Sequence, residues 1–288
     1  MTRPAPVAPA PPAPVVAALR CSVCGGEVAL QARTLRCSAG HSFDLARQGY
    51  VNLLHATVPK GTADTAAMVA AREAFLRRGF YAPLAHALAA RVEPEQDRLV
   101  IDAGAGTGYY LTHVLDALPE ATGLALDVSA PALKRAARAH PRLGAVVWNL
   151  WQPWPVASGV ADLVVNVFAP RNADEFRRVL APGGRLLVAG PGPGHLADLA
   201  DDLGLLDVGT DKTERLDAAL ADGFRLVDRA DVTDRVTFTP DDVRDVVLMG
   251  PNAHHLHRNG LADRLAAVTD PRTTTTTAFT VSVYERLG

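Results

Sequence analysis

All three cysteines of the chain fall within one short segment. Cys21, Cys24 and Cys37 are followed by His41, in the spacing C-x2-C-x12-C-x3-H. Three thiolates and an imidazole supply the four tetrahedral donors that a structural zinc ion requires, and protein ligands then fill every position. Buried reduced thiols beside an unrelated histidine are the other interpretation. The use of every cysteine at ligand spacing favours a closed, non-catalytic zinc site.

Length and composition indicate more than one folded unit. The chain has 288 residues and 48% hydrophobic content, enough for one large domain and a smaller one. No apolar stretch approaches the roughly 18 residues that span a bilayer, and the start MTRPAPVAPAPPAPVV lacks the features of a secretion signal. We therefore expect a cytoplasmic protein without a membrane partner, and a disordered tail over residues 1–17.

Basic residues are unevenly distributed, although the net charge is only −2. Five Lys or Arg against two acids occur in residues 18–60, namely Arg20, Arg33, Arg36, Arg47 and Lys60. A second group consists of Lys134, Arg135, Arg138 and Arg142. Each group is either a solvated face or a contact surface for a polyanion.

Residues 98–108, RLVIDAGAGTG, have the pattern of a buried strand that enters a glycine-rich turn. The strand ends at Asp102, the turn contains Gly104, Gly106 and Gly108, and YYLTHVLDAL continues with helical spacing. Such a turn brings the backbone close to a ligand and aims helix N-terminal amides at it. A glycine turn that merely joins strand to helix is the alternative.

A second strand, GLALD, ends at Asp127, where a carboxylate can accept hydrogen bonds from ribose hydroxyls. A dinucleotide fingerprint would place glycine where Tyr109 stands. Asp102 would also repel a pyrophosphate but suits a cationic methionine moiety. The segment therefore favours S-adenosylmethionine over NAD.

Strand and helix patterns continue to alternate toward the C-terminus. DLVVNVF (162–168), a helix at DEFRRVL, RLLVAG (185–190) and a last, edge-type strand over 273–286 indicate a doubly wound α/β sheet. Asn149 follows the third strand, where its amide could reach an adenine edge. Residues 166–170 follow the fourth strand, at the carboxyl edge where such sheets bind ligands. We predict a Rossmann-like class I methyltransferase domain with a small N-terminal zinc-knuckle domain.

These signals divide the chain into four parts. We expect the tail over 1–17, a zinc-binding domain over 18–60, a helical linker or cap over 61–97, and the methyltransferase domain over 98–288.

Several segments together resemble the RlmA family of 23S ribosomal RNA guanine-N1 methyltransferases, including its macrolide-resistance branch. They are the zinc pattern, HSFDLARQGYVNLL (41–54), DTAAMVAAREAFLRRGFYAPL (64–84), IDAGAGTGYYL (101–111), LDVSAPALKRAARAHP (126–141), NVFAPRNADEFRRVLAPGG (166–184) and PGPGHLADL (191–199). The glycine motif alone indicates only a methyltransferase fold. The zinc pattern followed by GYVNLL is far more specific.

The resemblance implies zinc binding by Cys21, Cys24, Cys37 and His41. It also implies donor contacts from Tyr81, Gly106, Thr107 and His195, which sequence alone would assign to a core aromatic, a turn and an exposed loop. The full donor set that we expect is Tyr81, Asp102, Gly104, Gly106, Thr107, Gly108, Asp127, Asn149, Leu150 and His195. The implied activity is methylation of a guanine N1 in a 23S rRNA hairpin loop, with macrolide resistance as a possible consequence.

We expect Asn166, Phe168 and Pro170 to cradle the target base after it leaves its stack. The sequence identifies no general base for the guanine N1 proton. It departs from the family at MGPNAHHLHR, where His254, His255 and His257 occupy a region that usually carries an aromatic residue. These histidines could contact a base or cover the site.

Two other functions fit some of these features. A small-molecule methyltransferase could retain the zinc domain as a lid, and a non-catalytic RNA-binding module could keep a vestigial donor pocket. The intact set of glycines with Asp102 and Asp127 argues against the second. A homodimer is a further possible partner arrangement, since two zinc domains could grip one folded RNA.

Overall fold

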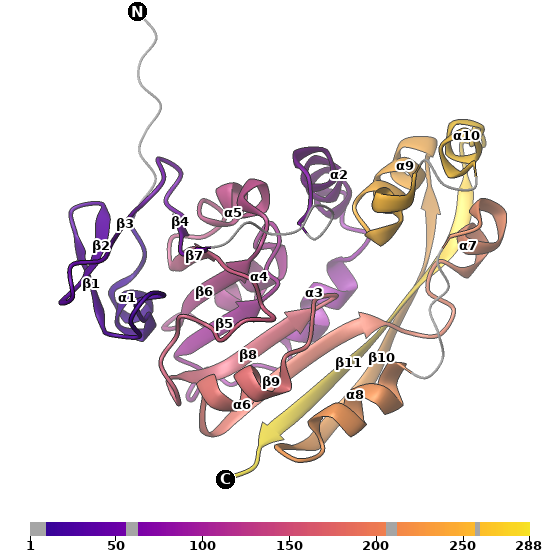
Figure 1. The fold of residues 1–288 in the computed structure, drawn as a ribbon. Coiled ribbons are helices and arrows are strands. Elements are labelled where there is room, and N and C mark those ends of the chain that lie inside the picture. Colours follow the sequence, from indigo (N-terminus) through magenta and orange to yellow (C-terminus); the bar gives the residue numbers. More distant parts are fainter. Residues whose placement is uncertain (1–9, 56–62, 206–211, 257–259) are drawn as a thin grey trace, which may run out of the picture.

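The computed structural model describes residues 10–55, 63–205, 212–256 and 260–288. A small N-terminal unit lies beside one edge of a large mixed sheet (Figure 1). The small unit contains α1 (Ala13–Ala18) and an antiparallel sheet of β1 (Val28–Gln31), β2 (Thr34–Cys37) and β3 (Ser42–Asp44). Its strands have only three or four residues, so little apolar area is available to hold them together.

The large sheet has eight strands in the order β10-β11-β9-β8-β5-β6-β7-β4. Their bounds are β4 (Val51–Asn52), β5 (Leu99–Ala103), β6 (Thr122–Asp127), β7 (Leu143–Val147), β8 (Ala161–Val167), β9 (Leu180–Pro191), β10 (Phe224–Phe238) and β11 (Thr273–Arg286). The strands from β4 to β9 are parallel, and β11 is antiparallel to both β9 and β10. The predicted Rossmann-like α/β sheet is confirmed.

Helices cover both faces of this sheet. The remaining helices are α2 (Ala66–Arg77), α3 (Ala82–Ala89), α4 (Tyr109–Ala117), α5 (Ala130–Ala136), α6 (Ala173–Val179), α7 (Ala197–Leu203), α8 (Lys212–Leu220), α9 (Pro240–Leu248), the 3-10 helix η1 (Pro251–His255) and α10 (Leu261–Ala266). Side-chain caps begin several of them: Thr65 accepts from the Met68 N–H, and Thr239 forms a capping box with Asp242.

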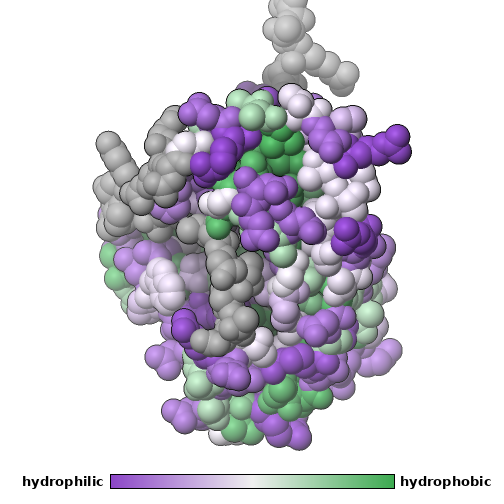
Figure 2. Space-filling view, turned by 90° about the vertical axis from the view of Figure 1, so that its right-hand side faces the viewer, coloured by the Kyte–Doolittle hydropathy of each residue, from purple (hydrophilic) through white to green (hydrophobic). Residues whose placement is uncertain are grey.

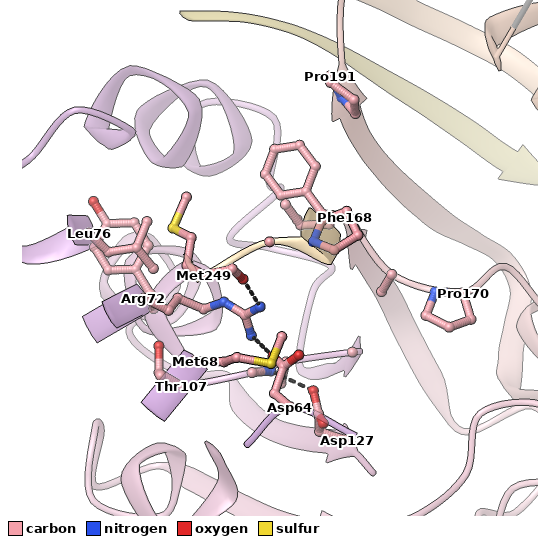
Figure 3. Close-up of a pocket in the computed structure, with 18 of the residues that line it drawn as sticks. Asp64, Met68, Arg72, Leu76, Thr107, Asp127, Phe168, Pro170, Pro191 and Met249 are labelled. Carbon is pink, nitrogen blue, oxygen red and sulfur yellow. Dashed lines mark hydrogen bonds and ion pairs between the residues drawn. The ribbon is translucent and has the colours of Figure 1, made fainter. Parts of the chain in front are cut away.

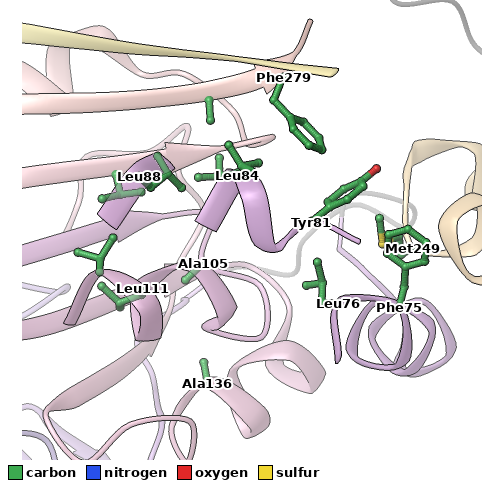
Figure 4. Packing of buried hydrophobic residues seen from close by; sticks show 14 of the residues in the cluster. Phe75, Leu76, Tyr81, Leu84, Leu88, Ala105, Leu111, Ala136, Met249 and Phe279 are labelled. Atoms are coloured by element: carbon green, nitrogen blue, oxygen red, sulfur yellow. The ribbon is translucent and has the colours of Figure 1, made fainter. Parts of the chain in front are cut away.

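The core divides into two layers because successive strand residues point to opposite faces. In fully buried β5, Val100 packs with α3 and α4, whereas Ile101 packs with α1 and α6. Figure 4 shows part of the first layer, where Phe75, Leu84 and Phe279 from distant segments meet around Tyr81. This layer also supports the helices that surround the carboxyl edge of the sheet.

The N-terminal boundaries differ from those expected. The prediction of a disordered tail is wrong for its described part, because α1 packs its fully buried Val15 against the sheet. Gly144 makes this contact possible, since a Cβ there would lie 2.8 Å from the Val15 Cγ1. The segment assigned to the zinc domain also supplies β4, which pairs with β7 of the large sheet. The two units therefore share a border strand.

The C-terminal strand was correctly predicted as a strand but not in its position. β11 lies between β9 and β10, so β10 is the edge strand. Figure 2 shows the side that carries α7, α10 and this strand pair, where apolar areas are small and separated by hydrophilic residues. Among the described helices, none has the length and apolar character to cross a bilayer.

Candidate functional site

The four predicted metal ligands converge in the N-terminal unit. The ligand atoms of Cys21, Cys24, Cys37 and His41 all lie within 4.8 Å of one another. The Cys24 and Cys37 sulfurs are 3.8 Å apart, and the His41 Nδ1 lies 3.5 Å from the Cys21 sulfur. Sulfurs at about 2.3 Å from a tetrahedral zinc would be separated by roughly 3.8 Å. The donor set and its spacing therefore fit a closed zinc site.

Two backbone turns hold these ligands. In the first, the Gly25 N–H donates to the Cys21 carbonyl at 2.8 Å, with Gly25 at a φ of 73°. In the second, the Gly40 N–H donates to the Cys37 carbonyl at 3.1 Å. Burial would raise the pKa of the Cys37 thiol, but hydrogen bonds from His41 lower it to about 6. The second turn therefore favours the thiolate form of Cys37, which is the form that a metal binds.

A cavity of about 620 Å³ opens at the carboxyl edge of the large sheet. Figure 3 shows its walls, which come from the glycine loop, the loop after β8, α2 and the end of α9. The predicted donor residues that line it are Tyr81, Gly104, Gly106, Thr107, Asp127, Asn149, Leu150 and His195. Asp102 and Gly108 do not line it.

The glycine loop is shaped by close packing as well as by backbone conformation. Gly104, Gly106 and Gly108 all have positive φ. A Cβ on Gly104 would lie 2.2 Å from the Cβ of Ala169, so only glycine lets the two loops approach. A Cβ on Gly108 would lie 3.1 Å from the Ala136 backbone in α5. Gly108 thus sets helix packing, and Gly104 sets the cavity floor.

Asp127 is held in position by the backbone. Its Oδ2 accepts from the Gly106 N–H and its Oδ1 from the Ser129 N–H, each at 2.8 Å. Burial raises the pKa of Asp127, and these two hydrogen bonds oppose the rise. Its remaining lone pairs face the cavity, which suits the ribose contact that we predicted.

Asp102 lies beneath the loop and is only 1% exposed. Its Oδ1 has no hydrogen-bond partner among the described residues. Burial, with a smaller contribution from the Asp127 charge, raises the pKa of Asp102 to about 8. This raised pKa favours the neutral form of the Asp102 carboxyl group at pH 7.

Tyr81 and His195, both expected from the resemblance to contact the donor, lie side by side in the cavity wall. The Tyr81 hydroxyl lies 3.0 Å from the His195 Nε2, and the His195 Nδ1 accepts from the Ala278 N–H at 3.1 Å. That acceptor role places the proton of a neutral imidazole on Nε2, which then donates to Tyr81. Burial raises the pKa of Tyr81, so its hydroxyl remains a donor.

Two of the three residues that we expect to cradle the target base line the cavity. Phe168 and Pro170 line the cavity, and Phe168 is 45% exposed with a φ of 53°. Asn166 does not line it: its buried amide donates to the Ala103 and Pro170 carbonyls at 2.9 and 3.0 Å. The prediction that Asn166 faces the base is therefore corrected, because this amide links β5 to the loop after β8.

Sequence reasoning missed a large part of the cavity wall. Asp64, Met68 and Arg72 come from α2 and its N-terminal flank, and Met249 comes from the end of α9. Asp64, Met68 and Arg72 belong to the segment 64–84, which contributed to the family resemblance, but sequence reasoning assigned no role to any of them. Trp151, after β7, lines the cavity while 62% exposed.

The three histidines near the end of α9 do not share one position relative to the cavity. His254 lines the cavity. His255 does not, and its Nδ1 is buried without a hydrogen-bond partner in the described chain. His257 lies outside the described residues.

Four of the basic residues in the two predicted groups have structural partners, two in each group. Arg142 donates to the carbonyls that end α4, and Arg135 pairs with Glu73 at 2.7 Å. These two arginines are therefore engaged within the protein, whereas Lys134 and Arg138 are exposed.

In the N-terminal unit, Arg20 donates to the Leu19 carbonyl and Arg33 to the Ala46 carbonyl. Arg36 and Arg47 are exposed. Lys60 lies outside the described residues.

Family models match both units of the chain. The model described as "RlmA, N-terminal" matches residues 19–58, and the model described as "Methyltransferase domain" matches residues 100–184. A chain from the complex of the Haloferax volcanii Trm112 methyltransferase activator with a methyltransferase aligns with a TM-score of 0.54 at 17% identity. That alignment covers 81% of this chain and all of the other. It supports the fold alone.

Two relatives are similar over nearly their whole length. A Streptomyces fradiae protein named "23S rRNA (guanine(748)-N(1))-methyltransferase" is 46% identical, and the match covers 88% of this chain and 91% of the relative. A Micromonospora griseorubida protein named "Putative 23S rRNA (guanine-N(1)-)-methyltransferase" is 49% identical, covering 89% and 94%. With the zinc unit, the methyltransferase sheet and the donor cavity all in place, this chain belongs to the RlmA family of 23S rRNA (guanine-N1)-methyltransferases.

Proposed function

We propose that this protein transfers a methyl group from S-adenosylmethionine to N1 of a guanine in a hairpin loop of 23S rRNA. The observation that carries the proposal is the 46–49% identity to relatives named for this activity, over about nine-tenths of both chains. The match of residues 19–58 to the RlmA N-terminal model extends the similarity beyond the methyltransferase fold.

The cavity suits an aligned two-substrate reaction. Bound S-adenosylmethionine supplies the methyl group, and Asp127, Thr107, Asn149 and the Tyr81–His195 pair would hold it. Phe168 lies at the carboxyl end of β8, beside the rings of Tyr81 and Phe279 at 6.2 and 5.9 Å. An exposed aromatic ring held at positive φ by its surroundings can stack on a base that has left its stack.

The base cradle that we propose consists of Phe168 and Pro170. Asn166 positions that loop by holding the Ala103 and Pro170 carbonyls. Because alignment of donor and acceptor supplies much of the rate in such a displacement, a small movement of this loop would lower the turnover number more than the donor affinity.

Guanine N1 must lose a proton during the reaction. Tyr81 has a raised pKa and the His195 Nε2 already donates to it, so neither is suited to accept that proton. His254 lines the cavity on the η1 side and can accept a proton as a neutral imidazole. We propose His254 as the group that receives it, directly or through water.

The N-terminal unit is proposed to contact the RNA. Arg36 and Arg47 are exposed, and Val23 in the first turn is 53% exposed. Cationic side chains on a rigid metal-held surface can bind phosphates without reading sequence. Two such units in a homodimer could grip one folded RNA, which light scattering with and without a 23S rRNA fragment would test.

The decisive experiment maps methylated nucleotides by mass spectrometry in 23S rRNA incubated with protein and S-adenosylmethionine. We expect a single N1-methylguanine in a hairpin loop. An RNA with adenine at the mapped position is the matched control and should accept no methyl group.

Failure to methylate rRNA, together with turnover of small aromatic or sugar acceptors, would instead support the small-molecule methyltransferase. If the mapped activity is found, expression in a macrolide-sensitive host lacking the modification tests resistance. We expect a raised inhibitory concentration that is lost in Asp127→Ala.

A further inference from the structure

The cavity has one residue whose charge is not explained by the contacts considered so far. Among the described residues that line it, Arg72 is the only lysine or arginine. Two carboxylates, Asp64 and Asp127, line the same cavity. Apart from Arg72 and the two histidines, His195 and His254, the ionisable groups in the lining are acids or tyrosines.

Arg72 lies directly over the glycine loop. A Cβ on Gly106 would be 3.2 Å from the Arg72 Nη1, so the guanidinium lies in tight contact with the loop backbone. In Figure 3 the side chain extends from α2 between Met249 and Asp64, toward Asp127. It therefore sits where a ligand that contacts both Gly106 and Asp127 would pass.

Two anchors fix the orientation of the guanidinium. Nη1 forms an ion pair with Asp64, and Nη2 donates to the Met249 carbonyl at 2.6 Å. The side chains of Arg72 and Asp64 are 24% and 20% exposed. A guanidinium has five N–H groups, and these two contacts leave others for a further acceptor.

The methyl donor carries a negative group that needs a cation nearby. The methionine part of S-adenosylmethionine ends in a carboxylate, and a carboxylate that enters a partly buried site beside other acids is repelled unless a cation is close. The planar guanidinium fork is the side chain best matched to a carboxylate.

We propose that Arg72 binds the methionine carboxylate of the donor. Asp64 and the Met249 carbonyl are positioning groups that hold the guanidinium over the glycine loop. The role deepens donor binding and does not depend on which acceptor is methylated.

The test compares two ligands that differ in the amino-acid part. S-adenosylhomocysteine carries the carboxylate, whereas 5′-methylthioadenosine keeps the adenosine and lacks it. By calorimetry, Arg72→Gln should bind S-adenosylhomocysteine roughly 10- to 100-fold more weakly. Its affinity for 5′-methylthioadenosine should stay within about twofold of wild type, because this ligand has no carboxylate for Arg72 to bind.

Arg78→Gln is the matched control. Arg78 is the C-cap residue of the same helix and pairs with Asp242 and Asp245 of α9 at 2.9 and 2.8 Å, but it does not line the cavity. Its loss loosens the same α2–α9 contact without removing the cation, so neither ligand should be favoured over the other.

Equal weakening of both ligands in Arg72→Gln would show that the residue only supports the wall, and would overturn the proposal. Unchanged S-adenosylhomocysteine affinity would overturn it as well. Because no RNA is present, either result leaves the proposed acceptor untouched, whereas failure of rRNA methylation by the wild type would leave the Arg72 result standing.

Discussion

The zinc unit and the donor cavity both hold a few side chains in fixed positions, but they do so by different means. The zinc unit places four ligands within a span of 21 residues, in and beside a sheet whose strands have three or four residues. The cavity collects its walls from residue 64 to residue 254 on a sheet whose central strand is fully buried. One depends on a single ion and the other on packing, so they should respond to different perturbations.

The difference also explains how the two units are joined. Leu35 and Leu45 of the N-terminal unit pack in the same apolar cluster as Ile101 of the large sheet. β4 then adds Val51–Asn52 to the edge of that sheet. The metal-held unit is therefore anchored to the packed one, and separating their contributions requires perturbations that act on one alone.

The largest expected effect comes from loss of the metal. Binding of structural zinc is worth on the order of 10–16 kcal/mol in small zinc domains, so Cys24→Ser should unfold the β1–β3 sheet. We expect rapid amide exchange in residues 20–45, no co-purified zinc and loss of rRNA methylation. Donor affinity in the cavity should fall by less than about tenfold, since its lining is separate.

Zinc-replete wild type is the control for this variant. Complete loss of donor binding in Cys24→Ser would contradict the independence of the two units, because it would show that they fold as one cooperative structure.

A second effect belongs to the packed unit alone. The pKa of Asp102 is raised from 3.8 to about 8 in the folded protein. Between these values the folded state binds a proton that the unfolded state does not, so stability falls as pH rises from about 4 to 8. In donor-free protein the loss should be on the order of a few kcal/mol.

Asp102→Asn removes that titration and should flatten the pH dependence. Urea unfolding of both proteins at pH 5.5 and 8.5 measures it. Parallel curves for wild type and variant would contradict the raised pKa.

Next in size is the loss of the ribose contact. Asp127→Ala removes a charged acceptor facing the cavity and releases the Gly106 N–H. Donor binding should weaken by about 1.5–3 kcal/mol, measured by calorimetry with S-adenosylhomocysteine. Zinc content should not change, which confines the effect to the cavity. An affinity equal to wild type would refute the placement of the ribose.

The smallest effects are expected on the surface of the zinc unit. Arg36→Gln and Arg47→Gln should each reduce the salt dependence of RNA binding by about 0.7–0.9 in the log–log slope. Arg33→Gln is a useful contrast, because Arg33 also donates to the Ala46 carbonyl and its loss should lower thermal stability. Unchanged slopes in the first two variants would leave the zinc unit with a structural role only.

The predictability of the two units follows from the range of their contacts. The zinc ligands are close in sequence and chemically specific, so Cys21, Cys24, Cys37 and His41 could be assigned from spacing. The glycine loop and Asp127 were likewise found, because strand, turn and helix are consecutive. Tyr81 and His195 are 114 residues apart; only the family resemblance pointed to them as donor contacts, and only the structure showed that they contact each other.

Sequence by itself determined the ligand set, the α/β alternation and the donor class, since each depends on residue type at short range. Tertiary structure decided which of these groups face a substrate. It buried the Asn166 amide as a link between β5 and the loop after β8, turned Arg142 into a cap for α4, and ordered α1 against Gly144. It also brought Arg72 over Gly106 and next to Asp64 and Met249. Such choices depend on packing between segments far apart in the chain, where burial and partner geometry outweigh local preference.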